Sequence, residues 1–221
     1  MDADAYQTTN LSSEERLEQD RVLGELAQRT RELMDAQLRT QVDLAEAAGI
    51  SEELGRITRR LLSNATPDPL GVEISHDGRI RNPGNTVVGH RNPVAPPLHV
   101  QTSSDGRAWA SFRLNALYEG PPGLVHGGVS ALVLDQMLGE AAAAGNAPGM
   151  TGRLTLSYRR PTPLGDLSAE AWIVQVNGIK TTVKGHLKDA DGNPTVEAEG
   201  LFILPRWARE AMAKARPDRF E

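Results

Sequence analysis

Cysteine is absent from this chain of 221 residues. Its absence excludes disulfide bonds, thiolate metal sites and a cysteine nucleophile. Long apolar runs are missing as well, because the longest strongly apolar run, Val129–Leu134, is far too short to cross a bilayer. The acidic first residues lead into no apolar segment of the kind that a secretory signal needs. These absences predict a cytoplasmic protein that is not associated with a membrane.

Positive charge is scarce in the first part of the chain, which has no lysine before Lys180. Residues 1–63 hold 13 acidic residues against eight arginines, whereas the charges of the remaining residues balance. This asymmetry accounts for the net charge of −5. Because an acidic segment repels the phosphates of nucleic acids, the composition disfavours a nucleic-acid partner.

Proline is also absent from the first 66 residues, although 14 prolines follow. We therefore expect a helical N-terminal extension over residues 1–66. Ser12 and Glu15 have the spacing of a capping box, and the leucines that follow them have helical spacing. Gly49 is expected to interrupt the helical pattern, and Ser51 is expected to cap a second helix.

A connection rich in proline and glycine follows over residues 67–97 and is expected to have little regular structure. From residue 98 the apolar residues alternate with a period of two, and one apolar helix interrupts them. The main domain is therefore placed at residues 98–205, and a short terminal helix is expected within residues 206–221. The expected strands cover residues 98–103, 107–117, 151–160, 166–176, 179–188 and 195–204, and the expected helices cover residues 127–144 and 207–215.

The helix expected at residues 127–144 is apolar around most of its circumference, which is typical of a helix that is buried on all sides. An antiparallel sheet that wraps around this single helix is the economical way to bury it. The order of elements thus predicts an α+β protein of the hotdog fold, with one long central helix and a helical extension at its N-terminus.

Two features of this central helix could support chemistry. Asp135 lies among apolar residues, where an unpaired carboxylate is costly to bury. The alternative is a structural aspartate that is hydrogen-bonded or faces solvent at the edge of the helix. His126, Gly127 and Gly128 stand at the helix N-terminus, where free amides and the helix dipole favour a developing negative charge. Gly128 and Asp135 are separated by about 10 Å along the axis, so one helix can hardly present both to one carbonyl group. This spacing predicts a dimer whose site is built from both copies.

The same residues carry a family resemblance. Residues 121–129 read Pro-Pro-Gly-Leu-Val-His-Gly-Gly-Val, with Asp135 nine residues after the histidine, and residues 158–165 read Tyr-Arg-Arg-Pro-Thr-Pro-Leu-Gly. This pattern resembles the PaaI-like hotdog thioesterases, most closely the branch that includes the mitochondrial long-chain acyl-CoA thioesterases. The resemblance covers about residues 98–205 and implies hydrolysis of acyl-CoA thioesters. Whether the chain forms a homodimer or a dimer of dimers is left open by the sequence.

The resemblance also implies roles for individual residues. Asp135 would act as general base or nucleophile, and an amide of the segment His126-Gly127-Gly128 would stabilise the oxyanion. Thr151 would assist catalysis from the strand that follows the helix. Three further residues would contact the coenzyme A moiety of the substrate, namely Ser157, Arg159 and Lys180. Close relatives have an arginine directly before this lysine, where the chain has Ile179.

Two other functions stay open on the sequence. Residues 43–51, with Arg56, Arg59 and Arg60 behind them, resemble the turn region of a DNA-binding helix-turn-helix, which would make the chain an acyl-CoA-binding transcriptional regulator. The acidic charge of the extension argues against this alternative. A hotdog enoyl-CoA hydratase would keep the fold, but the Asp/His pair typical of hydratases is not recognisable here. No metal-ligating or phosphate-binding motif is found, so neither a metal nor a cofactor is expected.

Overall fold

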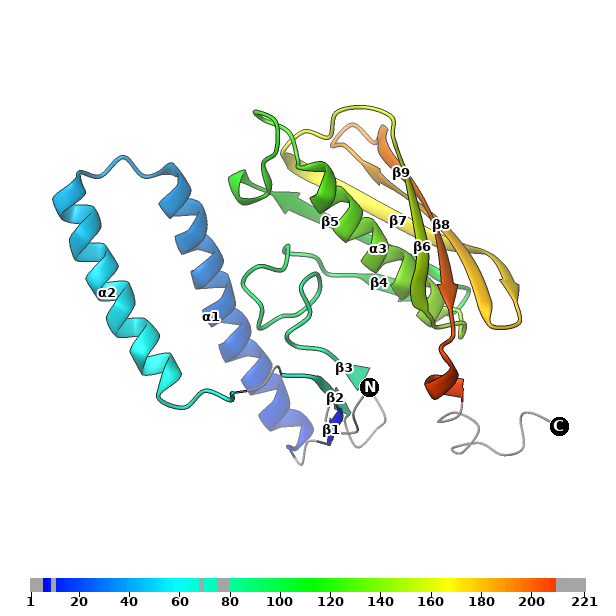
Figure 1. Cartoon of the computed structure of the whole chain (residues 1–221), viewed down its shortest axis with the longest axis horizontal. Coiled ribbons are helices and arrows are strands. Elements are labelled where there is room, and N and C mark those ends of the chain that lie inside the picture. The colour runs from blue at the N-terminus through cyan, green and yellow to red at the C-terminus, as the bar shows by residue number, and fades with distance from the viewer. Residues whose placement is uncertain (1–5, 9–10, 68–69, 75–79, 210–221) are drawn as a thin grey trace. The chain divides into compact units, whose positions relative to one another are not determined.

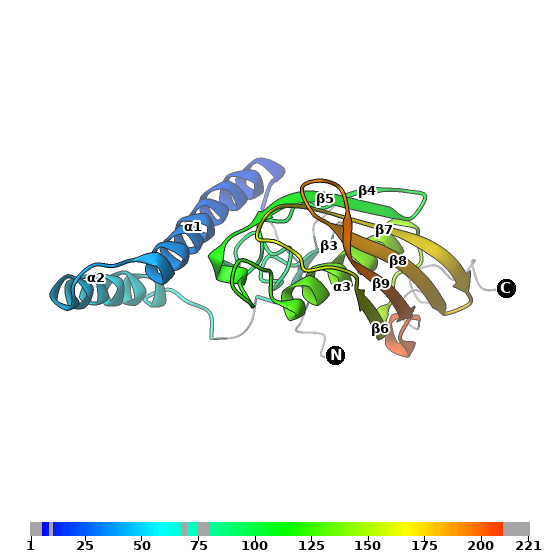
Figure 2. The ribbon, with the colours of Figure 1, turned by 90° about the horizontal axis from the view of Figure 1, so that it is seen from above.

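A computed structural model describes residues 6–8, 11–67, 70–74 and 80–209 of the chain. The chain divides into two compact units, residues 1–95 and 96–221. Figure 1 labels the helices and strands of both units, and Figure 2 shows the chain from above. Within the described ranges, no helix is both long enough and apolar enough to span a membrane.

The first unit contains two long helices, α1 (Ser13–Arg39) and α2 (Leu44–Leu62), which run in opposite directions (Figure 1). The predicted capping box at the start of α1 is confirmed. The Glu15 amide donates to Oγ of Ser12 at 3.2 Å, and the Ser12 amide donates to Oε2 of Glu15 at 2.9 Å. Two of the free amides at this helix end are thereby satisfied, which explains why α1 begins here.

The break between the two helices does not lie where the sequence predicts it. It falls at residues 40–43, where the Asp43 side chain caps α2 by accepting two backbone N–H groups at 2.9 Å each. The predictions that Gly49 ends a helix and that Ser51 caps the next are wrong, because both residues lie inside α2. One glycine costs a helix only about 1 kcal/mol relative to alanine, so a strong cap upstream outweighs it. Residues 43–51 therefore contain no turn between two helices, which the helix-turn-helix alternative requires.

The segment rich in proline and glycine, residues 67–97, is more regular than predicted. It contributes strands β2 (Val72–Ile74) and β3 (Ile80–Arg81), which pair antiparallel. Strand β1 (Tyr6–Thr8) pairs parallel with β2 and completes a three-stranded sheet. The extension is therefore not wholly helical, and residues 67–97 are not wholly irregular. This pairing joins segments more than 60 residues apart, which local sequence patterns do not reveal.

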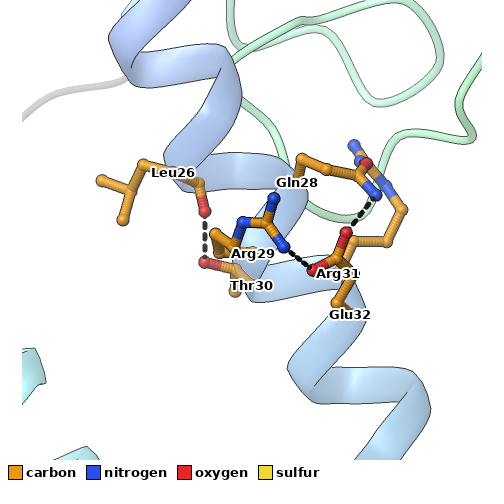
Figure 3. A network of polar contacts seen from close by, with 6 residues as sticks. All are labelled: Leu26, Gln28, Arg29, Thr30, Arg31 and Glu32. Atoms are coloured by element: carbon orange, nitrogen blue, oxygen red, sulfur yellow. Dashed lines mark hydrogen bonds and ion pairs between the residues drawn. The ribbon is translucent and has the colours of Figure 1, made fainter.

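The remainder of this segment, residues 82–95, packs along one face of α1. The guanidinium of Arg31 on α1 (Figure 3) donates to the carbonyls of Ala95 at 3.1 Å and Asn92 at 3.5 Å. On the same side of α1, Nε2 of His90 lies 2.9 Å from the carboxylate of Asp20. These contacts give one face of α1 a partner within its own unit.

The second unit is built on a six-stranded sheet with the strand order β4-β5-β7-β8-β9-β6, in which every neighbouring pair is antiparallel. Its strands are β4 (Gln101–Ser103), β5 (Arg107–Leu114), β6 (Met150–Tyr158), β7 (Gly165–Asn177), β8 (Lys180–Lys188) and β9 (Pro194–Ile203). Helix α3 (Gly127–Ala144) lies along one face of this sheet (Figures 1 and 2). The predicted α+β hotdog fold is confirmed.

Helix α3 covers the residues that the sequence predicts and forms the centre of the core. Its buried residues come from all along its length and are Ser130, Val133, Leu134, Met137, Leu138, Ala141 and Ala142. The strands present alternate residues to it, as in β5, where buried and exposed positions alternate throughout. The sheet therefore packs against α3 along its whole length and holds the side chains of the helix in position.

The element boundaries differ from the prediction in small ways. Strand β4 begins three residues later than expected. Strand β5 ends at Leu114, because the Asn115 side chain accepts a backbone amide and turns the chain into a short 3-10 helix, η2 (Ala116–Tyr118). Residues 206–209 are helical, and the rest of the expected terminal helix lies outside the described residues.

Candidate active site

Helix α3 begins at a tight junction around His126. Nδ1 of His126 accepts the Gly128 amide at 3.0 Å, and the His126 carbonyl accepts the amides of Val129 at 2.9 Å and Ser130 at 3.2 Å. The preceding loop lies so close that a Cβ added at Gly120 would be 2.7 Å from Cα of His126. The histidine is thus fixed as the cap of α3.

The two glycines at this junction differ in what their amides bind. The Gly128 amide is occupied by the His126 ring, whereas the Gly127 amide has no hydrogen-bond partner within the described part of the chain. A free amide at the positive end of a helix can donate to an anion. Of the three predicted residues His126, Gly127 and Gly128, only the middle one therefore offers a free donor.

Tyr158 is a residue that the sequence does not predict at this site. Its hydroxyl donates to the Gly127 carbonyl at 2.8 Å, and its ring lies close enough that a Cβ on Gly127 would meet it at 3.4 Å. The contact joins the last residue of β6 to the first residue of α3. Only the tyrosine of the motif at residues 158–165 hints at it in the sequence.

A cavity of about 400 Å³ opens at the same junction. Its lining includes Gly127, Ser130 and Tyr158 together with two arginines, Arg159 and Arg160. An amide donor and two cationic side chains in one cavity suit a ligand that carries negative charge.

Asp135 lies eight residues beyond Gly127 on α3, which corresponds to about 12 Å along the axis at 1.5 Å per residue. Its side chain is half-buried, and Oδ1 accepts the Thr151 hydroxyl at 2.8 Å. Thr151 is exposed near the start of β6. The structure thus brings Asp135 and Thr151 together, and it leaves the second carboxylate oxygen without a partner among the described residues. Asp135 is not part of the cavity at Gly127.

Two of the residues expected to contact coenzyme A lie at the Tyr158 end of β6. Arg159 follows Tyr158 directly beyond the end of β6 and also lines the cavity at Gly127. Ser157 precedes Tyr158 and, because successive strand residues point to opposite faces, lies on the sheet face turned away from α3. Both line a second cavity there, of about 470 Å³. Arg159 forms an ion pair with Glu197 at 2.8 Å.

Lys180, the third residue expected to contact coenzyme A, lies at the opposite end of the sheet. In the strand register, Lys180 of β8 and Met150 of β6 both pair with Ile203 of the intervening strand β9. Two strand spacings, about 10 Å, therefore separate Lys180 from the start of β6, next to Thr151. Within one chain, the predicted site residues are divided between two ends: Asp135, Thr151 and Lys180 at one, and Gly127, Ser157 and Arg159 at the other.

A group of titratable side chains lies on the outer face of the sheet. Nε2 of His186 lies 3.1 Å from Oε2 of Glu170, and Lys188 donates to the same oxygen at 3.3 Å. Burial lowers the pKa of His186, and the charge of Lys188 lowers it further. Burial would raise the pKa of Glu170, but its contacts with Lys188 and His186 bring that pKa below its ordinary value. In the described ranges, no group of three or more His, Cys, Asp or Glu side chains could hold a metal ion.

Comparison with known proteins gives the family. A crystal structure of a thioesterase superfamily protein is 38% identical to this chain with a TM-score of 0.74, and the match covers 82% of this chain and 90% of that one. The chain belongs to the thioesterase superfamily. The sequence model of the thioesterase superfamily matches residues 122–196, which include α3 and strands β6 to β8. The family resemblance predicted from the sequence is thereby confirmed.

Two curated relatives are named acyl-coenzyme A thioesterase THEM4. The protein from Xenopus laevis is 32% identical over 94 residues, which is 42% of this thioesterase superfamily chain and 42% of the relative. The protein from Bos taurus is 30% identical over 105 residues, 47% of this chain and 43% of the relative. The chain thus spans less than half the length of these curated relatives.

Proposed function

We propose that this member of the thioesterase superfamily hydrolyses acyl-CoA thioesters to the free acid and coenzyme A, with Asp135 as general base or nucleophile. The observation that carries the proposal is the hydrogen bond from Thr151 to Asp135. It orients one carboxylate oxygen of a half-buried side chain and leaves the other oxygen available for a water molecule or a carbonyl carbon. The two relatives named as acyl-coenzyme A thioesterases support this substrate class.

The Gly127 amide is the better candidate for the oxyanion donor. The Gly128 amide already donates to the His126 ring, whereas the Gly127 amide is free and lines a cavity at the positive end of α3. A preorganised donor of this kind stabilises the negative charge that develops on a thioester oxygen. His126 then acts by capping the helix, and Tyr158 holds the Gly127 carbonyl in place.

The donor and the carboxylate cannot serve one thioester within one chain, because about 12 Å separates them along α3. Strand β6 offers a way to bring them together. It is a nine-residue strand at the edge of the sheet, and its outer side is unpaired in the described part of the chain. Antiparallel pairing with β6 of a second copy would set the Thr151 end of one strand against the Tyr158 end of the other. Asp135 would then face Gly127 of the partner subunit.

The same pairing would unite the divided coenzyme A residues. Lys180 lies at the Thr151 end of the sheet, and Ser157 and Arg159 lie at the Tyr158 end. A two-fold axis through the middle of β6 therefore brings Lys180 of one copy to the end of the sheet at which Ser157 and Arg159 of the other copy lie, twice per dimer.

In such a site the amide of Gly127 of the partner subunit donates to the thioester carbonyl oxygen. Asp135 either removes a proton from the attacking water or attacks the carbonyl carbon itself. The oxyanion then collapses and the carbon–sulfur bond breaks. On the general-base route, protonated Asp135 returns its proton to the departing thiolate, and the free acid forms directly. On the nucleophilic route, the thiolate takes a proton from water, and the acyl group stays on Asp135 as a mixed anhydride that a water molecule hydrolyses to the free acid. General-base catalysis contributes about 10²–10⁴-fold and an oxyanion donor about 10²–10³-fold, so both groups are needed for a useful rate.

Release of free thiol from a panel of short-chain, long-chain and aromatic acyl-CoAs tests the proposal. The chain has no cysteine, so a thiol reagent reports only the coenzyme A that is released. We expect thiol release that is stoichiometric with the free acid for at least one acyl class. Loss of enoyl absorbance from an enoyl-CoA without thiol release would identify a hydratase and contradict the proposal, as would a lack of both signals across the panel.

A further inference from the structure

Strand β6 departs from regular pairing next to Thr151. In the register with β9, Thr151 lies opposite Phe202. Arg153, two positions further along β6, lies opposite Leu201, which directly precedes Phe202 in β9. Gly152 therefore has no place in the register, and one extra residue of this kind is a β-bulge. The remainder of β6 pairs with β9 without interruption, so the irregularity is confined to the start of the strand.

The bulge decides which face of the sheet Thr151 points to. Residues two apart in a regular strand share a face, so counting back from Ser157 would place Thr151 on the outer face, turned away from α3. Because of the extra residue, Thr151 instead lies opposite Phe202, whose ring would be 3.6 Å from a Cβ added at Gly139 of α3. The Thr151 hydroxyl thereby points toward α3 and donates to Asp135 at 2.8 Å.

The bulge also explains why a glycine stands at position 152. A Cβ added there would be 2.8 Å from Cδ1 and 3.2 Å from Cγ1 of Ile203, and 3.4 Å from the Leu201 carbonyl oxygen. Carbon atoms in favourable contact are about 3.5–4.0 Å apart. The bulge as it is formed therefore leaves no room for a side chain on Gly152 unless Ile203 or the strand moves.

Regular pairing is the arrangement to which the strand would move. A shift of one residue would place residue 152 opposite Phe202 and Thr151 opposite Ile203, on the outer face. The extra residue would then pass into the loop at residues 145–149, and loops accept an added residue at little cost. A β-branched side chain at position 152 favours this regular pairing, both by its strand propensity and by its contact with Ile203.

We propose that Gly152 is a positioning residue of the candidate active site. It permits the bulge that turns the Thr151 hydroxyl from the outer face toward Asp135. Bulges beside active sites re-aim side chains in this way. The inference rests on the proposed function, because it concerns the residue that orients the general base or nucleophile.

Two substitutions of equal shape test the role of the bulge. Gly152→Val should lower kcat about tenfold, to the level of Thr151→Val, and leave KM unchanged, because the hydrogen bond to a charged group is lost. Gly152→Thr has the same branching but carries a hydroxyl, which regular pairing would place opposite Phe202 in the position that Thr151 leaves. Its kcat should therefore stay close to that of the wild type. An unchanged kcat in Gly152→Val, or an equal loss in both variants, would overturn the proposal.

Double variants test whether Gly152 acts through Thr151. Gly152→Val should have no further effect on kcat in the Thr151→Val background, whereas independent effects would multiply to about a hundredfold loss. Gly152→Thr in the same background should raise kcat above that of Thr151→Val, since a hydroxyl again reaches Asp135. Multiplied losses, or no recovery with Gly152→Thr, would overturn the proposal.

A crystal structure of Gly152→Val gives a result that does not depend on activity. We expect residue 152 opposite Phe202 and the hydrogen bond between Thr151 and Asp135 broken. If Gly152→Val does not fold in a thermal unfolding assay, Gly152→Ala replaces it, because its Cβ alone meets Ile203 at 2.8 Å. A bulge and a Thr151–Asp135 bond that are both retained would overturn this inference alone, whereas a wild-type chain without thiol release would contradict the proposed function.

Discussion

Helices α2 and α3 are nearly equal in length, with 19 and 18 residues, but opposite in their surroundings. Seven residues of α3 are buried by the sheet of the same unit, whereas none of α2 is buried. In α3, core packing explains the seven buried side chains, and Asp135 stands out beside them as a half-buried carboxylate that accepts the Thr151 hydroxyl. In α2, the exposed large apolar side chains stand out instead. In both helices, the side chains that neither core packing nor helix stability explains are the candidates for a function.

The largest effect on turnover is expected from substitution of Asp135, the residue of α3 that core packing explains least. Asp135→Asn should lower kcat by about 10²–10⁴-fold while leaving the fold intact, because the side chains are isosteric and only the base or nucleophile is lost. Thiol release and thermal unfolding measure the two quantities. Glu140→Gln, on the same helix, is the matched control and should leave turnover nearly unchanged. Near-normal turnover of Asp135→Asn would make Asp135 a structural residue.

A pair of leucines sharpens the contrast in packing. Leu138→Ala, at a side chain that is 0% exposed in α3, should lower the free energy of unfolding by about 2–5 kcal/mol. Leu61→Ala, at a side chain that is 53% exposed in α2, should cost no more than about 0.5 kcal/mol. Denaturant titration of both variants measures the difference. Equal costs for the two variants would show that α2 is packed within its own chain.

The same contrast explains how much the sequence predicts. The bounds of α3 follow from its apolar circumference and from the glycines after His126, and the alternating strands around it follow from their period of two. Asp135 and Thr151 are predicted by the family resemblance, and their hydrogen bond places them together. In α2, where no core enforces the pattern, the weak break at Gly49 competes with the cap at Asp43, and the prediction is wrong.

What the sequence does not predict depends on contacts between distant segments. The strand pair β1–β2 joins residues more than 60 positions apart. Tyr158 reaches Gly127 across 31 positions, because β6 lies beside the start of α3. The choice between the Gly127 and Gly128 amides depends on a side-chain contact of His126, which the spacing of residues does not specify.

A smaller effect is expected from the residue that supports Asp135. Thr151→Val keeps the shape and β-branching of the side chain but removes the hydrogen bond to the carboxylate. A hydrogen bond to a charged group contributes about 1.5–3 kcal/mol, so kcat should fall by about tenfold or more. Thr182→Val, in strand β8 and outside both cavities, is the control for strand propensity. Unchanged kinetics of Thr151→Val would show that the hydroxyl has no part in the reaction.

The smallest effect is expected away from both helices, at His186. Since burial lowers the pKa of this histidine in the folded protein, the unfolded chain binds a proton more readily below pH ~6.5. The free energy of unfolding should therefore decrease as the pH falls from about 7 through 6.5 toward the lower folded-state pKa. His186→Gln should flatten this slope, whereas His99→Gln, at an exposed histidine of the same unit, should not. An unchanged slope in His186→Gln would contradict the conclusion that the burial of His186 causes this pH dependence.

Subunit complementation tests most directly the central claim, that Asp135 of one copy acts with Gly127 of the partner subunit. Chains with Asp135→Asn and chains with Gly127→Leu should each be inactive alone. When they are mixed and refolded, one site of each heterodimer carries both lesions and the other carries neither, so random pairing should restore about a quarter of the wild-type activity. A mixture that stays inactive although heterodimers are detected would contradict the claim and place both groups in a site within one chain.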